Sequence, residues 1–373
     1  MPDLAMAASK HPLFARVLPE RYASTGAFGP LEVGPSRFPG LDAYVETVTA
    51  NHLFNREQLE LYGNLHFGDV ARGEWEVAED LDLSTWGNNY YDCVLTAARL
   101  FARTGDPRFL DLMAPMASHF LETACFNTDD PDDWLSGFSP AYGEHHRGTG
   151  HFEQHYAEGI WAYHYLTGDE RAREVGLRGA ESIVERQPWG NENVNCRTAY
   201  QRGSTCIEAY KATRDARYIQ HAKHLLVDMI LATQDRYGRI GWVDAERGKI
   251  KGEQSFMMAL YADTLWKYLK EAPDAAASAK LARLADFLDR YARKKPGREA
   301  YWNQFPRPND RRKPEPVPGQ PEPTVYWNSH GLIAGVYACA YDLTGNGKYL
   351  LLAQNCLADM WNSQSKDKRS CHT

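Results

Sequence analysis

Apolar residues recur at helical spacing along most of this chain, and the helical segments come in pairs joined by a short, repeated turn. A segment from Tyr90 to Arg103 ends at Thr104-Gly105-Asp106, and a second segment, from Pro107 to Phe126, follows it. The same order recurs at three further turns, which read Thr167-Gly168-Asp169, Thr213-Arg214-Asp215 and Thr344-Gly345-Asn346. A helical hairpin cannot bury its apolar stripe alone, so repeated hairpins must stack on their neighbours. The pattern predicts an all-α fold, an (α/α)6 toroid.

The full set of predicted helices is one short of six hairpins. Leu41 to Tyr62 has a helical pattern of its own, and Gly252 to Glu271 and Ala275 to Lys294 form a pair without the turn signature. The count is therefore about eleven helices in hairpin repeats, which is an incomplete barrel. We expect residues 1–40 to form an irregular arm around the outside, residues 41–362 to form the toroid, and residues 363–373 to be a disordered polar tail.

Composition and motifs exclude several classes of protein. The net charge of -7 leaves no broad basic surface for DNA or RNA. Neither a membrane span nor a signal peptide is recognisable, so we expect a cytoplasmic protein, or a secreted one if upstream sequence is missing. Glycine-rich phosphate loops and nucleophile-elbow motifs are absent from the sequence. The seven cysteines are scattered, which favours free thiols over a disulfide framework.

The segments that lead into the first helix of each pair share an unusual chemistry, whereas the second helices begin with ordinary surface residues such as Glu170. In a toroid the first helices form an inner barrel, so these segments converge at one of its ends, where a ligand would bind. Helix caps and buried aromatic rings explain any one cluster structurally, but explain less well why all occupy equivalent positions. The candidates are Trp86, Asn88, Asn89, Tyr91, Asp92, His145, His146, Arg147, His151, His155, Tyr156, Glu158, Tyr200, Arg202, Glu253, Trp302, Trp327, Asn328 and His330.

Histidines are concentrated in one of these segments, and two of them have helical spacing. His151 and His155 lie four residues apart, so on a helix they would share a face, which Glu158 extends. We favour an acid–base and substrate-binding role over a divalent metal site, because the zinc-protease pattern is missing. Structural histidines remain the alternative. We predict neither a metal nor a cofactor.

A set of motifs occurs in a definite order along the chain: Tyr62-Gly63, Phe67-Gly68-Asp69, Trp86-Gly87-Asn88-Asn89, Tyr91-Asp92, the histidine pair before Glu158-Gly159, and Tyr165-Leu166-Thr167-Gly168-Asp169. This ordered set resembles the α/α-toroid domain of rhamnogalacturonan exolyase and YetA-like proteins, a polysaccharide lyase group. The resemblance spans roughly Leu41 to Trp361. It differs in two respects, since such lyases have β-sandwich domains that this chain lacks, and the ring is one helix short. Additional domains or a partner subunit would then complete the cleft.

The resemblance implies polysaccharide degradation by β-elimination from a polysaccharide or oligosaccharide that contains a uronic acid. A base removes the proton at C5, an acid protonates the leaving oxygen, and the enolate-like state needs its carboxylate neutralised. The expected bases are His155 or His151, and the expected acids are Tyr200 or Tyr156. Arginine would clamp the carboxylate because it is bidentate and permanently charged. The expected clamps are Arg202 and Arg147, assisted by His330 or Asn328. The residues expected to stack on sugars are Trp86, Trp302 and Trp327. Those expected to bind sugar hydroxyls are Asn88, Asn89 and Asp92.

Two alternatives remain open on the same scaffold. A glycoside hydrolase needs two carboxyl groups across the scissile bond, and Asp92, Glu158 and Glu253 could supply them. A non-catalytic carbohydrate-binding toroid would bind oligosaccharide without turnover, as the incomplete ring allows.

Overall fold

The computed structural model describes the helical hairpins and parts of the segments between them, in two compact units. The units are Met1–Arg186 and Gln187–Thr373, and each is described by itself. The described residues are 16–38, 40–58, 61, 68, 70–71, 85–86, 89, 91–126, 155–186, 194–238, 240–241, 243–244, 249–250, 254–295, 298–301 and 329–364.

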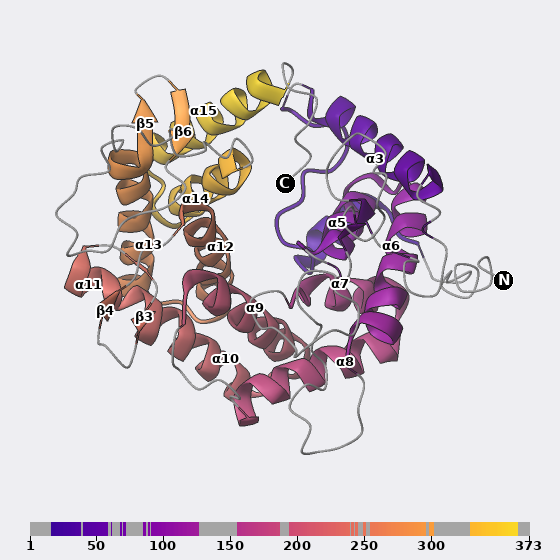
Figure 1. Cartoon of the computed structure of the whole chain (residues 1–373), viewed down its shortest axis with the longest axis horizontal. Coiled ribbons are helices and arrows are strands. Elements are labelled where there is room, and N and C mark those ends of the chain that lie inside the picture. The colour runs from indigo at the N-terminus through magenta and orange to yellow at the C-terminus, as the bar shows by residue number, and fades with distance from the viewer. Residues whose placement is uncertain are drawn as a thin grey trace. The chain divides into compact units, whose positions relative to one another are not determined.

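In its described part, the first unit holds two N-terminal helices and two helical hairpins (Figure 1). The N-terminal helices are α2 (Pro19–Thr25) and α3 (Leu41–Gln58), and α2 lies in the arm that we expected to be irregular. The hairpins are α5 (Cys93–Thr104) with α6 (Arg108–His119), and α7 (Glu158–Thr167) with α8 (Glu170–Glu181). α5 packs against both α6 and α7, so the first helices of successive hairpins lie side by side, as inner helices should.

The second unit repeats this arrangement. Its described helices are α9 (Cys196–Thr213), α10 (Ala216–Lys223), α11 (Thr233–Tyr237), α12 (Ser255–Glu271), α13 (Ala275–Phe287), α14 (Ser329–Thr344) and α15 (Gly347–Gln364). α12 packs against α9 on one side and α14 on the other, while α10, α13 and α15 each pack on one or more of these three. The all-α hairpin architecture predicted from the repeats is confirmed.

Four second helices end in a π-helical stretch, in which backbone hydrogen bonds span five residues instead of four. These stretches are η1 (Phe120–Ala124) after α6, η3 (Ser182–Arg186) after α8, η4 (His224–Leu231) after α10 and η5 (Leu288–Ala292) after α13. A hairpin is antiparallel, so the end of its second helix lies beside the start of its first. Within each unit, the π-helical stretches therefore lie beside the starts of first helices.

Short antiparallel strand pairs stand in three of the connections that precede first helices. They are β1 (Val70–Ala71) with β2 (Thr85–Trp86), β3 (Val243–Asp244) with β4 (Lys249–Ile250), and β5 (Arg293–Lys295) with β6 (Arg298–Tyr301). In the first pair Val70 lies opposite Trp86. Each strand has at most four residues, so these pairs anchor loops and add no sheet layer.

The repeated turn has one geometry wherever it occurs. In the first copy, the Thr104 hydroxyl donates to the Leu100 carbonyl at 2.7 Å and accepts from the Asp106 backbone N–H at 3.1 Å. Gly105 has φ 71°, and the Asp106 carboxylate accepts from the Arg108 backbone N–H at 2.9 Å. The threonine thus closes one helix, the left-handed residue reverses the chain, and the aspartate caps the next helix. This explains why the motif predicted the helix boundaries.

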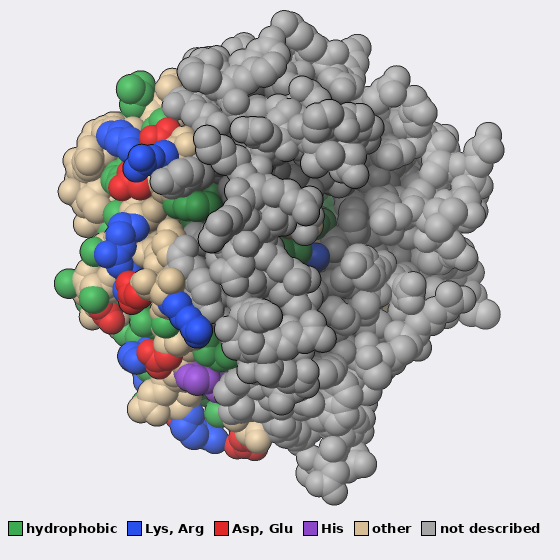
Figure 2. Space-filling view, turned by 60° about the vertical axis from the view of Figure 1, so that its left-hand side comes forward, with side chains coloured by type: hydrophobic (Ala, Val, Ile, Leu, Met, Phe, Trp, Pro, Cys, Tyr) green, Lys and Arg blue, Asp and Glu red, His purple; other side chains and the backbone are tan. Residues whose placement is uncertain are grey.

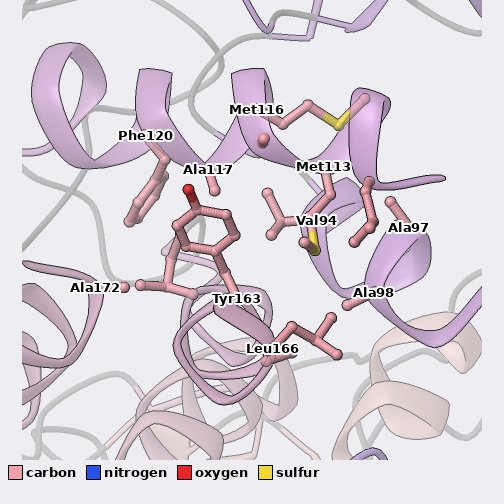
Figure 3. Packing of buried hydrophobic residues seen from close by; sticks show 14 of the residues in the cluster. Val94, Ala97, Ala98, Met113, Met116, Ala117, Phe120, Tyr163, Leu166 and Ala172 are labelled. Atoms are coloured by element: carbon pink, nitrogen blue, oxygen red, sulfur yellow. The ribbon is translucent and has the colours of Figure 1, made fainter. Parts of the chain in front are cut away.

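Burial of apolar side chains between α5, α6 and α7 forms the core of the first unit. Figure 3 shows Val94, Met113 and Tyr163 facing one another from these three helices, and each is fully buried or nearly so. Phe120, in η1, lies at the edge of the same cluster. The stripe that one helix cannot bury alone is therefore buried by its neighbours.

The Asp92 carboxylate joins the starts of α5 and α7. It caps its own helix by accepting from the Leu95 backbone N–H at 3.2 Å. It also accepts from the Gly159 backbone N–H, at 3.1 Å and 3.0 Å to its two oxygens. α7 has no side-chain cap from its own N-cap residue, Ala157. One side chain therefore satisfies otherwise unpaired donors of two helices whose starts are far apart in sequence.

Glycine at position 159 is required for this joint. A Cβ atom placed on Gly159 would lie 2.2 Å from Asp92 Oδ1 and 2.5 Å from the Leu95 backbone nitrogen. A Cβ atom placed on Gly335, in the inner helix α14, would meet no atom within 4 Å. The two glycines offer a matched comparison.

We predict that Gly159→Ala lowers the free energy of unfolding by about 2 kcal/mol or more, because the joint must open to admit the methyl group. Gly335→Ala is the control, and it should leave stability unchanged or raise it by up to about 1 kcal/mol, since alanine favours helix. Urea unfolding of both variants measures this. Equal stabilities would show that Asp92 does not hold the two helices together.

Candidate functional site

The predicted site residues divide into those whose side chains the structure describes and those outside it. His151, Asn88, His145, His146, Arg147, Glu253, Trp302, Trp327 and Asn328 lie outside the described residues. Trp86 and His330 lie in β2 and α14, where only the backbone is described. In the first unit, the structure brings together Asn89, Tyr91, Asp92, His155, Tyr156 and Glu158. Tyr200 and Arg202 are described on α9 of the second unit.

The turn before α5 is strained and held by hydrogen bonds. Asn89, Tyr91 and Asp92 have φ of 57°, 60° and 57°, the left-handed region that side chains disfavour. The Asn89 amide group donates to Asp92 Oδ1 and to the Tyr156 carbonyl, both at 3.0 Å, and accepts from the Val94 backbone N–H at 3.1 Å. Strained backbone of this kind persists where the surroundings fix it, and it is concentrated at functional sites.

Asp92 is a buried carboxyl group whose proton affinity reflects its surroundings. Burial, and after it the negative charge of Glu158, raises the pKa of Asp92 from 3.8 to about 6, against the opposing hydrogen bonds from Asn89, Gly159 and Leu95. The side chain is 4% exposed. These contacts show that Asp92 and Asn89 build the turn, so any bond they make to substrate would be additional to that role.

His155 lies directly before α7, beside the end of the preceding hairpin. Its ring centroid is 5.9 Å from that of Phe120 in η1, and its side chain is 2% exposed. Burial lowers the pKa of His155 from 6.5 to about 4, so the imidazole is neutral near pH 7. A neutral imidazole can accept a proton, as a catalytic base must.

Two tyrosines cover the same region. The ring centroids of Tyr91 and Tyr156 are 5.6 Å apart, and Tyr156 is buried whereas Tyr91 is exposed. Tyr91 thus presents an aromatic surface beside the buried Asp92 and His155 group. Such a surface is suited to stacking on a sugar ring.

In the second unit, Arg202 is buried on the face of α9 that packs against α10. Its charge lies close enough to His221 of α10 to help lower the pKa of that histidine to about 4, after the larger effect of burial. Its neighbour Gly203 faces Leu226 of η4. A Cβ atom placed on Gly203 would lie 3.2 Å from the Leu226 side chain. Tyr200, one turn earlier, is also buried. Arg202 therefore contributes to packing between α9 and α10, and its predicted role as a carboxylate clamp remains a prediction.

Sequence reasoning missed Gln201, which lies between these two candidates. The side chain is 1% exposed, and neither amide atom has a hydrogen-bond partner in the described part of the chain. A glutamine early in an inner helix is the only sequence signal of it. The signal is weak because glutamine is also a common helix former.

Metal binding and membrane insertion receive no support from the described part. No group of three or more His, Cys, Asp or Glu side chains there is placed to hold a metal ion. His151 lies outside it, so the paired-histidine metal alternative is untested. None of the described helices is long and apolar enough to cross a bilayer. Where Figure 2 shows described side chains, positive and negative groups alternate over the surface without a patch of one sign.

Comparisons with known proteins identify the fold. No family model matches the chain, and no curated protein matches its sequence. A sugar epimerase from a ruminal bacterium matches with a TM-score of 0.63 at 14% identity, over 87% of this chain and 86% of the other. D-mannose isomerase matches with a TM-score of 0.57 at 14% identity, over 88% of each chain. The cellobiose 2-epimerase of Spirochaeta thermophila gives 0.55 at 14% identity, over 89% and 87%. The chain has the α/α-toroid fold.

Because the pKa of His155 is lowered in the folded protein, the free energy of unfolding decreases as the pH falls. The unfolded histidine takes up a proton below its ordinary pKa of 6.5, whereas the folded one does so only near its pKa of about 4. The stabilisation is therefore present above pH 6.5 and lost as the pH falls toward 4. Asp92 acts in the opposite direction, because its pKa is raised. The comparison must therefore be made with a variant at the same pH.

We predict that the free energy of unfolding falls by about 2 kcal/mol less in His155→Phe than in the wild type when the pH is lowered from about 7 to about 5. Phenylalanine does not titrate, and its ring can pack on Phe120 in place of the imidazole. Urea unfolding at the two pH values measures the difference. Parallel losses in both proteins would show that His155 titrates normally and is not desolvated.

Proposed function

We propose that this chain is a carbohydrate-active enzyme that removes a proton from a sugar carbon next to a carboxyl or carbonyl group. The observation that carries the proposal is His155, a buried imidazole kept neutral at the start of an inner helix. It lies beside the strained turn that holds Asp92 and the exposed ring of Tyr91. The solved structures with the same fold include a sugar epimerase and D-mannose isomerase, which supports carbohydrate as the substrate class.

Within this class, we favour β-elimination from a uronic acid residue. His155 would take the C5 proton, the pair of electrons would move into the bond between C4 and C5, and the leaving glycosidic oxygen would receive a proton from an acid such as Tyr156. An anionic uronate close to His155 would raise the pKa of the imidazole from about 4 toward the working pH. The order of motifs shared with the rhamnogalacturonan exolyase group supports the same reaction.

A sugar isomerase or epimerase is the second candidate, and the three structures of the same fold favour it. Its reaction starts with the same chemical step, removal of a proton from the carbon next to a carbonyl group. The neutral imidazole serves both reactions, so the base alone does not distinguish them. The substrate does, because elimination needs a carboxyl group at C5 and isomerisation needs an open-chain carbonyl group at C1.

The hydrolase alternative has less support from the geometry. The Asp92 carboxylate oxygens accept hydrogen bonds from Leu95, Gly159 and Asn89, and the side chain is buried. A hydrolytic carboxylate has to reach the glycosidic bond or a water molecule. Glu158 is also buried, and Glu253 lies outside the described residues.

Product analysis separates the two candidates. Rhamnogalacturonan, polygalacturonate, cellobiose and D-mannose are each incubated with the enzyme in D2O. Elimination produces an alkene conjugated with the carboxylate, which absorbs in the ultraviolet. Isomerisation and epimerisation produce no alkene. Isomerisation to the ketose places deuterium at C1 of the product, whereas epimerisation places it at C2. Hydrolysis produces reducing ends with neither signal and would contradict the proton-abstraction step.

We predict that His155→Gln lowers kcat by about 10²–10⁴-fold on whichever substrate is turned over, because the base is lost. His164→Gln is the matched control, since His164 lies at the other end of α7, where its Nδ1 is 2.9 Å from the Asp169 carbonyl. The control should keep nearly full activity. Calorimetric binding of the substrate confirms that each variant is folded. Full activity of His155→Gln would exclude this residue as the base.

A further inference from the structure

Gln201 is a buried polar side chain whose hydrogen-bonding capacity is unused within the described part of the chain. It occupies the second turn of α9, with 1% of its surface exposed. Its Oε1 and Nε2 atoms are both inaccessible and have no hydrogen-bond partner in the described part of the chain. An amide group can accept through its oxygen and donate through its nitrogen, so all of this capacity is unsatisfied.

The hydroxyl groups next to Gln201 do not relieve this. The Ser204 hydroxyl donates to the Gln201 backbone carbonyl at 3.1 Å, and the Thr205 hydroxyl donates to the same carbonyl at 2.9 Å. Both therefore bond to the main chain of Gln201 and leave its side chain alone. Local side-chain to backbone bonding thus removes the nearest candidate partners.

An unsatisfied buried amide destabilises a protein, whereas an apolar side chain of similar size at the same place would not. Leaving a buried polar group without a partner destabilises the folded state, because the group has lost its water and gained nothing in return. Native proteins satisfy the large majority of such groups, and the exceptions call for an explanation such as a ligand. A leucine at position 201 would fill nearly the same volume.

The same face of α9 carries two further polar residues. Arg197 and Glu208 lie four residues before and seven residues after Gln201, a spacing that places all three on one side of the helix. Both are buried, and the Glu208 carboxylate accepts from Lys211 Nζ at 2.8 Å and 3.0 Å. Arg202 is the next residue along the helix, and its charge acts on His221 of α10. The face with Gln201 is thus polar although the helix is buried.

We propose that the Gln201 amide is a binding subsite for a saccharide, in which its N–H group donates to one ring hydroxyl and its carbonyl accepts from the neighbouring hydroxyl. Two adjacent sugar hydroxyls offer a donor and an acceptor side by side, which matches a primary amide. This subsite deepens the function proposed above and depends on it, because it is a sugar ligand whose adjacent hydroxyls would satisfy both amide atoms at once.

The first experiment tests the side chain without any ligand. Gln201→Leu removes the unsatisfied amide and keeps the volume, so the melting temperature should stay the same or rise. Thr264→Val is the matched control, since Thr264 in α12 is fully buried and its hydroxyl also lacks a partner in the described residues. It should behave in the same way. A lower melting temperature for Gln201→Leu alone would show that the amide supports the fold, and would overturn the proposal.

The second experiment tests binding by calorimetry, with trigalacturonate, cellobiose and D-mannose as probes. For a saccharide that the wild type binds, Gln201→Leu should weaken affinity about tenfold or more, since two hydrogen bonds are lost. Thr264→Val should bind as the wild type does. Equal affinity of Gln201→Leu and wild type would overturn the subsite and leave the proposed function standing. If the wild type binds none of the three saccharides, the proposed function fails, and the subsite fails with it.

Discussion

The Asp92 carboxylate is the interaction on which the first unit depends. It caps α5 through Leu95 and also binds the Gly159 backbone at the start of α7. α7 begins without a capping side chain of its own, so its position is fixed by the preceding hairpin. The same contact forces Asn89, Tyr91 and Asp92 into left-handed backbone and leaves no room for a side chain at position 159. The contacts that pack these two hairpins together are therefore the same contacts that build the candidate site.

In each unit, a π-helical end of a second helix contacts an inner helix or the residues that lead into it. η1 places Phe120 against His155, whose pKa is lowered by burial to about 4. In the second unit, the η4 backbone accepts a hydrogen bond at 2.6 Å from the Tyr261 hydroxyl of α12, through the Leu226 carbonyl. The scaffold thus controls the dielectric surroundings of the groups that could perform chemistry.

Buried polar side chains in the two units differ in whether their hydrogen-bonding groups have partners in the described part of the chain. Asp92 and Asn89 have their hydrogen-bonding groups engaged by backbone and by each other, which makes them elements of the structure. Gln201 has a satisfied backbone and an unsatisfied side chain. The second pattern is destabilising without a ligand, and the first is stabilising without one. The contrast separates residues that hold the fold from Gln201, which we propose as a substrate-binding residue, although all lie near the starts of inner helices.

The sequence by itself determined the hairpin repeat, the positions of the turns and most helix boundaries, because threonine, glycine and aspartate act on backbone groups within a few residues. It also marked the inner-helix starts as chemically unusual. Only the tertiary structure decided that Asp92 binds Gly159, a partner 67 residues away, and that the charge of Arg202 lies near enough to His221 to lower the pKa of that histidine. Residues Cys196 to Ala209 of α9 are buried on every side. Such a helix has no apolar stripe to show its orientation, so its direction comes from the helices that pack around it.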